Sequence, residues 1–212
     1  MIDTVFRNLS AQSREKKMQL FRSHFRASGR ILDIGAQLDQ GKGLLLEARE
    51  AGARTVACNL DPRHLERIRD GMQGVGAIQA DARKLPFPDK SFDLVFSNAV
   101  IEHVGSFDDQ RRMADEIRRV GERWFVTTPN RWFPFEFHTR MPFYGWLPAG
   151  WMQRAARLCS YNHVRRRYKF GGGAPYTRLI TRSELRRLFP ESEVIPVRVT
   201  LWPETFVVVG PR

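Results

Sequence analysis

The chain has 212 residues, of which 42% are hydrophobic and 27% charged, as in ordinary globular proteins and unlike disordered or fibrous ones. Its 35 Lys and Arg exceed its 23 Asp and Glu, and residues 129–212 hold 14 of the basic but 5 of the acidic side chains. No apolar run approaches the roughly 20 residues that span a bilayer, and residues 1–17 lack the apolar core of a signal peptide. Two cysteines, Cys58 and Cys159, are too few for a disulfide scaffold, so we expect a cytoplasmic protein.

Residues 1–28 are expected to form an N-terminal helix outside the pattern that follows. The stretch 10–27 carries apolar side chains at helical spacing among many charges: Met18, Leu20, Phe21 and Phe25. Such a helix lies with one face on a larger body.

From Gly29 onward, short apolar runs alternate with amphipathic stretches. Five runs are predicted to be strands: residues 30–34, 55–60, 75–80, 92–97 and 124–127. Three stretches between them are predicted to be helices: residues 41–51, 62 to about 70, and 108–120. This alternation predicts βα units, whose parallel strands form one sheet with helices on both faces.

The C-terminal part has a different pattern. A helix is predicted over residues 181–189, because Thr181 and Glu184 have the spacing of a capping box. Two apolar runs follow, 193–201 and 205–210, and the join at 202–204 is short enough for an antiparallel hairpin. The fold class is therefore α/β, a doubly wound, mostly parallel sheet that ends in an antiparallel hairpin, within a single domain over residues 1–212.

Residues 129–176 do not fit a further βα unit and are predicted to be an insertion or cap over the sheet. They combine eight large aromatic side chains within residues 132–151 with the basic run 165–167 and the glycines 171–173. We expect most of the aromatics to form the hydrophobic core of this cap. The alternatives are a lid over a substrate, a surface for a membrane interface or a lipid-linked substrate, and a stacking surface for RNA.

Polar or glycine residues follow four of the predicted strands, at the edge where open α/β sheets bind ligands. A glycine, Gly35, comes directly after the first strand and lets the backbone turn tightly. The other strands are followed by Asn59 to Pro62, by Asp81 and Ala82, and by Ser97 to Ala99. Side chains of this kind can hold the hydroxyls of a ribose, so together the loops predict a nucleoside-bearing ligand.

These loops carry a resemblance to a known family. Its motifs are Ile31-Leu-Asp-Ile-Gly35, Asn59-Leu-Asp-Pro62, Asp81-Ala82 with Leu85-Pro-Phe-Pro88, and the stretch 91–104. The chain resembles the class I S-adenosylmethionine-dependent methyltransferases, and among them the group of small-molecule enzymes related to quinone biosynthesis. The likeness covers roughly residues 28–130, and residues 85–104 are its most specific part because order, spacing and residue type all agree. It implies a Rossmann-like fold.

The resemblance also implies roles for individual residues. Near the methionine end of S-adenosylmethionine it places Asp33 and the backbone of Gly35 and Ala36. It assigns the ribose to Asn59 and Asp61, the face of the adenine to Leu60, the adenine amino group to Asp81 with Ala82 alongside, and the methyl-transfer mouth to Asn98. The chain departs from the family where Gln37 and Asp39 replace glycines and where Asn59 replaces an acidic residue.

Two histidines are candidates for a general base, His103 after the fourth strand and His138 in the predicted cap. Pairs of histidines or carboxylates at metal-ligand spacing are missing from the sequence, so we expect no metal site.

The leading hypothesis is a methyltransferase that acts on a small-molecule or lipid- or sugar-linked acceptor. Peripheral membrane association is a further expectation from the basic and aromatic segment. One alternative is a binding or scaffold protein that keeps the fold without methyl transfer, and another is an RNA methyltransferase, although no RNA-binding module is visible and a nucleic-acid partner is not expected. A nicotinamide dehydrogenase is disfavoured because no Gly-x-Gly-x-x-Gly follows the first strand.

Overall fold

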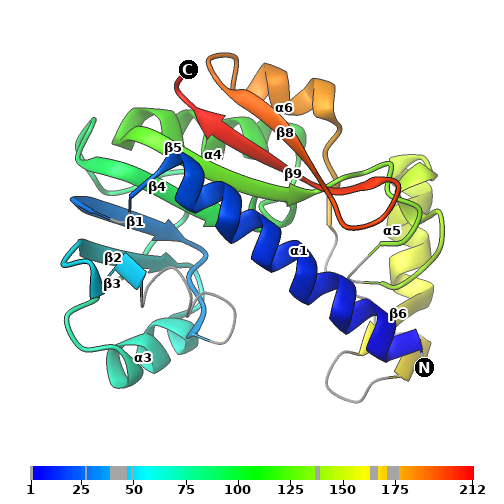
Figure 1. The fold of residues 1–212 in the computed structure, drawn as a ribbon. Helices are drawn as coiled ribbons and strands as arrows, with labels where there is room; N and C mark the ends of the chain where they lie inside the picture. Colours follow the sequence, from blue (N-terminus) through cyan, green and yellow to red (C-terminus); the bar gives the residue numbers. More distant parts are fainter. Residues whose placement is uncertain are drawn as a thin grey trace.

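A computed structural model describes residues 2–26, 28–38, 47–48, 50–136, 139–162, 167–170 and 177–212. Its centre is one sheet of seven strands: β1 Arg30–Ile34, β2 Arg54–Asn59, β3 Gly76–Gln79, β4 Phe92–Asn98, β5 Gly121–Pro129, β8 Glu193–Arg198 and β9 Pro203–Gly210. Their order across the sheet is β3-β2-β1-β4-β5-β9-β8 (Figure 1). The first five strands are parallel, β9 is antiparallel to both of its neighbours, and the predicted fold class is confirmed.

The strand order changes direction between β1 and β4. From β1 the chain builds outward through β2 to β3, and it then returns to place β4 on the other side of β1. A crevice forms at such a point beyond the carboxyl ends of the two strands, because the loops that follow them lead away in opposite directions. The fold therefore puts a ligand site where the loops after β1 and β4 begin.

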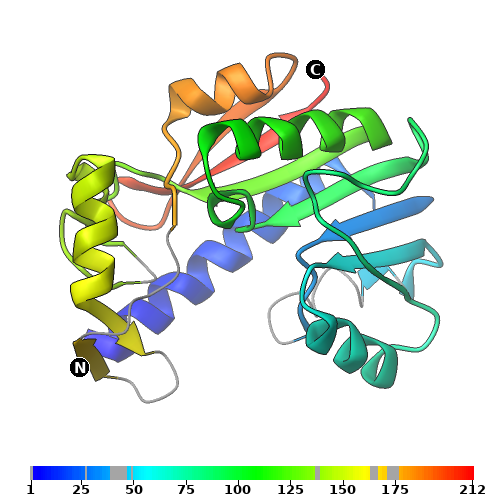
Figure 2. The same cartoon turned by 180° about the vertical axis from the view of Figure 1, so that it is seen from behind.

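Helices cover both faces of the sheet, as Figures 1 and 2 show. The helices are α1 Ile2–His24, α3 Pro62–Gly71, α4 Phe107–Val120, α5 Ala149–Leu158 and α6 Arg182–Leu188. Phe21 of α1 packs on Phe96 of β4 and Phe125 of β5, with ring centroids 5.7 and 5.4 Å apart. On the other face, Val95 of β4 belongs to a hydrophobic core that includes Ile117 of α4 and Leu185 of α6.

Most predicted elements lie within one or two residues of the observed ones. The exceptions are α1, which ends four residues before the predicted end at residue 28, and β5, which begins three residues before its predicted start. Most of the helix predicted over 41–51 falls outside the described residues. The capping box of α6 is confirmed, since the Thr181 side chain accepts a hydrogen bond from the Glu184 backbone N–H.

The predicted join of the C-terminal hairpin at residues 202–204 was wrong. β8 ends at Arg198, and Glu204 already belongs to β9. The buried Glu204 carboxylate accepts hydrogen bonds from the backbone N–H groups of Val199 and Thr200, at 2.8 and 2.7 Å. Because these donors turn inward to the carboxylate, they cannot continue the ladder of β8, and the turn comes earlier than the apolar pattern suggested.

Residues 129–176 contain the short 3₁₀ helix Tyr144–Trp146, helix α5, and the antiparallel pair β6 Cys159–Asn162 and β7 Arg167–Phe170. Figure 1 shows α5 at the end of the molecule toward which the parallel strands point. The expectation that most aromatics of this segment form a core was wrong, because six of them are exposed: Trp132, Phe135, Phe143, Trp146, Trp151 and Phe170. The hydrophobic cluster here is built on only three buried side chains, Tyr144, Met152 and Leu179, and is too small to enclose the others. The role of the segment as a cap over the sheet remains a prediction.

Among the described residues, no helix has both the length and the apolar character that crossing a membrane requires.

Candidate functional site

The loop after β1 requires a glycine at position 35. Gly35 has a φ of +77°, and a Cβ built on it would lie 2.2 Å from Cγ2 of Val100, in the loop after β4. Its backbone N–H donates to the carbonyl of Cys58 at 2.8 Å, which continues the pairing of β1 with β2 beyond the strand end. The glycine therefore lets the loops after β1 and β4 approach each other at the point where the strand order reverses.

Asp33 is a buried carboxyl group two residues before this glycine. Its Oδ2 atom has no hydrogen-bond partner among the residues that the structure describes, and burial raises the pKa of Asp33 to about 8. A desolvated carboxyl group is stabilised by a cation or a donor that reaches it. Asp33 thus fits a ligand that brings a positively charged amino group.

The side chain of Asn59 links the loops after β1 and β2. Its Nδ2 donates to the carbonyl of Ala36, and its Oδ1 accepts from the backbone N–H of Asp61, both at 2.9 Å. Leu60, between them, is 64% exposed, although it is a large apolar side chain. The structure therefore brings Ala36 and Asn59 together and leaves an apolar side chain uncovered beside them.

The carboxylate of Asp61 already has partners. It caps α3 by accepting from the backbone N–H of Arg63 at 3.0 Å, and it forms an ion pair with the Arg63 guanidinium at 2.6 Å. These hydrogen bonds lower the pKa of Asp61 to about 2. The side chain expected to hold a ribose is thus engaged by its own helix.

Asp81, after β3, is held in a similar way by Arg83. The guanidinium of Arg83 forms an ion pair with Asp81 at 2.6 Å and donates to Asp109 of α4 at 3.0 Å. The hydrogen bonds from Arg83 lower the pKa of Asp81. Ala82 is buried next to this bridge. A nucleobase amino group that reaches Asp81 would share its carboxylate with Arg83.

Asn98, at the carboxyl end of β4, contacts both β5 and the N-terminal helix. Its Oδ1 accepts from Thr127 Oγ1 at 2.8 Å and from Lys17 Nζ of α1 at 2.9 Å. Burial and the nearby Arg14 lower the pKa of Lys17 to about 8, against the opposing effect of Glu102. The structure therefore places a desolvated ammonium group at the position that the resemblance assigns to the methyl-transfer mouth.

The residues after Asn98 turn sharply. Ala99 has a φ of +56°, a conformation that non-glycine residues rarely adopt. The turn leads into the 3₁₀ helix Ile101–His103, in which Glu102 is buried and His103 is exposed. The Glu102 carboxylate accepts from Thr128 Oγ1 at 3.0 Å. The candidate base His103 is thus exposed, whereas its neighbour Glu102 is buried.

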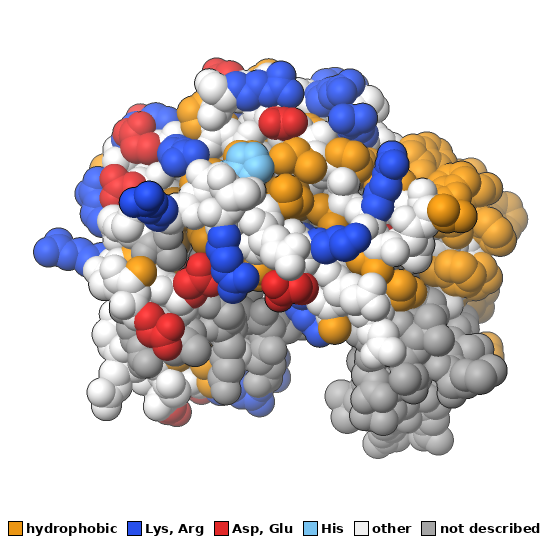
Figure 3. Space-filling model, in the orientation of Figure 1, with side chains coloured by type: hydrophobic (Ala, Val, Ile, Leu, Met, Phe, Trp, Pro, Cys, Tyr) orange, Lys and Arg blue, Asp and Glu red, His pale blue; other side chains and the backbone are white. Residues whose placement is uncertain are grey.

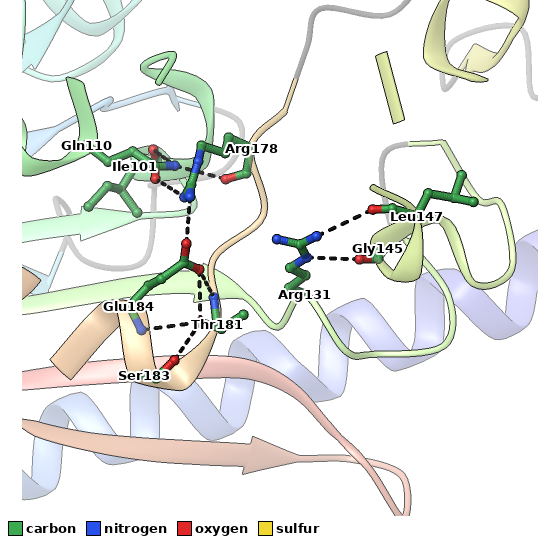
Figure 4. Close-up of polar contacts among 9 residues, drawn as sticks. All are labelled: Ile101, Gln110, Arg131, Gly145, Leu147, Arg178, Thr181, Ser183 and Glu184. Atoms are coloured by element: carbon green, nitrogen blue, oxygen red, sulfur yellow. Dashed lines mark hydrogen bonds and ion pairs between the residues drawn. The ribbon is translucent and has the colours of Figure 1, made fainter. Parts of the chain in front are cut away.

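A network around Arg178 fixes the chain where it returns from residues 129–176 (Figure 4). Arg178 donates to Gln110 of α4 at 2.7 Å and pairs with Glu184 of α6, and Gln110 donates to the backbone carbonyls of Ile101 and Arg178. Burial raises the pKa of Glu184, but hydrogen bonds from Thr181 and Arg178 outweigh it and lower the pKa. The network ties α4 and α6 to the loop after β4.

Sequence reasoning missed Lys17 and Arg83. The signal for Lys17 is its spacing, because Ser13, Lys17 and Phe21 lie four residues apart and share the buried face of α1. The signal for Arg83 is its place two residues after Asp81.

His138 lies outside the described residues. In the rest of the chain, as far as the structure describes it, no cluster of His, Cys, Asp and Glu could hold a metal ion.

A cavity of about 640 Å³ opens at the opposite edge of the sheet. Its lining includes Arg22, Phe25, Asp93 and Arg123, near the amino ends of β4 and β5. It is therefore separate from the loops described above.

Part of the chain is similar in sequence to known proteins. The family described as "Methyltransferase domain" matches residues 32–123. Malonyl-[acyl-carrier protein] O-methyltransferase of Methylococcus capsulatus is 32% identical over 102 residues, 47% of this chain and 37% of that protein. The enzyme of the same name from Halorhodospira halophila is 35% identical over 95 residues, 43% of this chain and 30% of that protein. The chain thus matches about a third of the length of these curated relatives.

A solved structure extends the likeness to most of the chain. The S-adenosylmethionine-dependent methyltransferase from Methanosarcina mazei superposes with a TM-score of 0.63 at 15% identity, over 90% of this chain and 95% of that one. At this identity the likeness shows a common fold.

Proposed function

We propose that the chain is a class I methyltransferase that transfers the methyl group of S-adenosylmethionine to a small-molecule acceptor, free or linked to a carrier, lipid or sugar. The match of residues 32–123 to a methyltransferase-domain family and the fold shared with a solved methyltransferase support this proposal. The observation that carries the proposal is the occurrence of Asp33 and Gly35 at the same strand end. A buried carboxyl group whose Oδ2 has no hydrogen-bond partner among the described residues lies two residues before a glycine that admits no Cβ, where the strand order reverses.

The residues present fit the cofactor. Asp33 would bind the amino group of its methionine part, and the backbone of Gly35 would lie beside it. The exposed Leu60 would cover one face of the adenine, and Asp81 would accept from the adenine amino group. When bound, S-adenosylmethionine supplies an electrophilic sulfonium methyl group. The chain's own task is then to align the acceptor with that group and to exclude water.

Lys17 and Asn98 are proposed to position the acceptor. The Lys17 ammonium retains its charge at pH 7, because its lowered pKa of about 8 still lies above that pH. A partly desolvated cation at this place favours an acceptor with an anionic oxygen, such as a carboxylate. The curated relatives named above methylate a malonyl group on an acyl-carrier protein, according to their names, which supports this acceptor class. His103 and His138 remain the proposed bases for an acceptor that must first lose a proton.

Calorimetric titration with S-adenosylmethionine and S-adenosylhomocysteine tests the proposal. We expect the wild-type chain to bind either ligand with a micromolar Kd, and Gly35→Ala to lose measurable binding because its Cβ would meet Val100. Gly52→Ala is the matched control, because Gly52 has nearly the same φ, +76°, but no atom within 4 Å of its added Cβ. Both variants carry the same backbone strain, so thermal unfolding of each shows whether loss of binding is loss of fold.

Absence of binding to the wild-type chain would contradict the proposal. It would favour the alternative of a binding or scaffold protein without methyl transfer, because Arg63 and Arg83 already occupy the carboxylates of Asp61 and Asp81. Equal loss of binding in Gly35→Ala and Gly52→Ala would contradict the placement of the ligand at the loop after β1.

The pH dependence of acceptor methylation tests the role of Lys17. The charge of a group with a pKa near 8 is lost as the pH rises from 7 to 9, so kcat/KM for an anionic acceptor is expected to fall over that range. Lys17→Met is expected to lower kcat/KM about 100-fold and to remove this pH dependence, whereas Lys17→Arg restores part of the rate. Binding of S-adenosylhomocysteine by Lys17→Met should be unchanged, and a parallel loss of that binding would contradict a role toward the acceptor.

A further inference from the structure

Five large aromatic side chains of residues 129–158 are exposed. They are Trp132, Phe135, Phe143, Trp146 and Trp151, with exposed fractions between 44% and 61%. We call these five residues the aromatic face. A protein rarely exposes so many large apolar side chains in one region unless they serve an interaction.

Contacts within the aromatic face show that Trp132, Phe135, Phe143 and Trp146 are neighbours. The rings of Phe143 and Trp146 meet edge to face with centroids 4.8 Å apart, and Trp146 Nε1 donates to the carbonyl of Trp132 at 3.2 Å. The backbone of Phe135 forms an isolated antiparallel β-bridge with that of Pro142, which precedes Phe143. Figure 3 shows apolar side chains gathered at the same end of the molecule, where Figure 1 places α5.

The backbone holds this face in a fixed shape. Phe143 has a φ of +56°, an unfavourable conformation for an aromatic residue, and it exposes its ring while the next residue, Tyr144, is buried. Arg131 donates to the carbonyls of Gly145 and Leu147, as Figure 4 shows. Local strain of this kind persists only where the surroundings enforce it. The exposure of Phe143 is thus built into the turn.

The charge around the aromatic face is positive. Residues 130–158 contain four arginines and one acidic residue, Glu136, which is buried. Two of the arginines lie over rings of the face, Arg131 over Trp132 at 5.3 Å and Arg154 over Trp151 at 5.7 Å. The partner of this surface must therefore accept tryptophan and phenylalanine rings next to cations and must itself be anionic.

We propose that the aromatic face docks the protein on the surface of an anionic lipid bilayer. Tryptophan rings are favourable at the boundary between headgroups and acyl chains, and arginines bind the phosphates of the headgroups. Docking presents the segment that follows β5 to molecules held in the membrane. The inference does not depend on methyl transfer, because it rests on the exposed residues alone.

Vesicle co-sedimentation of the full chain tests the proposal. Vesicles of phosphatidylcholine alone are compared with vesicles that contain about one third phosphatidylglycerol. The wild-type chain is expected to sediment with the anionic vesicles and to be released by salt. Phe143→Asn combined with Trp151→Gln is expected to lower the partition coefficient about tenfold or more. Asn tolerates the φ of position 143 better than Phe, so the variant should retain its fold.

Charge reversal supplies the matched control. Arg154→Glu, next to Trp151, is expected to weaken binding several-fold, whereas Arg186→Glu, exposed on α6, is expected to leave it unchanged. The proposal is overturned if the wild-type chain stays in solution with anionic vesicles, or if the double variant binds them equally well. It is also overturned if light scattering shows a dimer that Phe143→Asn with Trp151→Gln dissociates, because the face would then join two protein chains.

Discussion

Replacing Asp33 by Asn is expected to stabilise the protein at pH 7 while weakening cofactor binding about tenfold to 100-fold. Asp33 is buried within β1, and at neutral pH its carboxyl group stays protonated, because burial disfavours the carboxylate and no described residue donates a hydrogen bond to Oδ2. Keeping this proton well above the pH at which an unfolded aspartate loses it costs stability. The Asn side chain has nearly the same shape and does not ionise. A gain of about 2 kcal/mol, equivalent to roughly 4–8 °C in Tm, is the expected size of the effect.

The pH dependence of unfolding tests whether the protonation of Asp33 causes the expected gain in stability. Burial raises the pKa of Asp33 in the folded state to about 8, whereas an aspartate in an unfolded chain ionises near 3.9. Between about pH 4 and pH 8 the unfolded chain has lost a proton that the folded chain keeps, so this group makes stability fall as the pH rises. Asp33→Asn removes that contribution.

Thermal unfolding of the wild-type chain and of Asp33→Asn at pH 5 and pH 8 measures this difference. Asp70→Asn is the matched control, because Asp70 is exposed on α3. A gain in Tm for Asp33→Asn that is equal at both pH values would contradict the ionisation account. Unchanged affinity for S-adenosylhomocysteine in the same variant would contradict the proposed role of Asp33 in cofactor binding.

Gly145→Ala is expected to destabilise the protein by about 3 kcal/mol or more, which corresponds to a fall in Tm of at least roughly 6 °C. A Cβ on Gly145 would lie 2.0 Å from the carbonyl oxygen of Arg131, which belongs to the backbone and cannot rotate away as a side chain would. The turn would have to open, and with it the hydrogen bond from Arg131 to Gly145.

Gly150→Ala provides the comparison, because both substitutions change the unfolded chain in the same way. A Cβ on Gly150 meets no atom within 4 Å, and its helical position favours Ala by up to about 1 kcal/mol. Gly145→Ala should also weaken vesicle binding, although it keeps all five aromatic rings. Equal Tm values for the two variants would show that the turn accepts a side chain.

Strand β1 was predictable because both of its faces are buried. It was predicted with its observed bounds, since residues 31–34, which follow Arg30, form an apolar run that only Asp33 interrupts. The role of the glycine after β1 was predictable as well, because a tight turn directly after a buried strand often needs a positive φ, which glycine adopts readily. These features depend on residues that are close together in the sequence.

The remaining features depend on residues that only the fold brings together. Lys17 and Asn98 are 81 positions apart, and nothing near either residue in the sequence indicates that an ammonium group meets an amide there. The early turn of the C-terminal hairpin depends on where the Glu204 carboxylate points. Whether an aromatic residue of the segment 129–158 is buried, as Tyr144 is, or exposed, as Phe143 is, depends on a backbone conformation that residue type does not determine.

The place of β9 in the sheet has a consequence for synthesis of the chain. β9 pairs with β5 on one side and β8 on the other, and its partners on β5 lie roughly 80 residues earlier in the sequence. At the usual rates of translation, the free edge of β5 waits roughly 4 to 16 s before residues 203–210 emerge from the ribosome. During that time its apolar side chains, among them Phe125 and Val126, lack the strand that completes their core. A nascent chain that stalls in this interval presents an open sheet edge, the feature on which chaperones and aggregation both act.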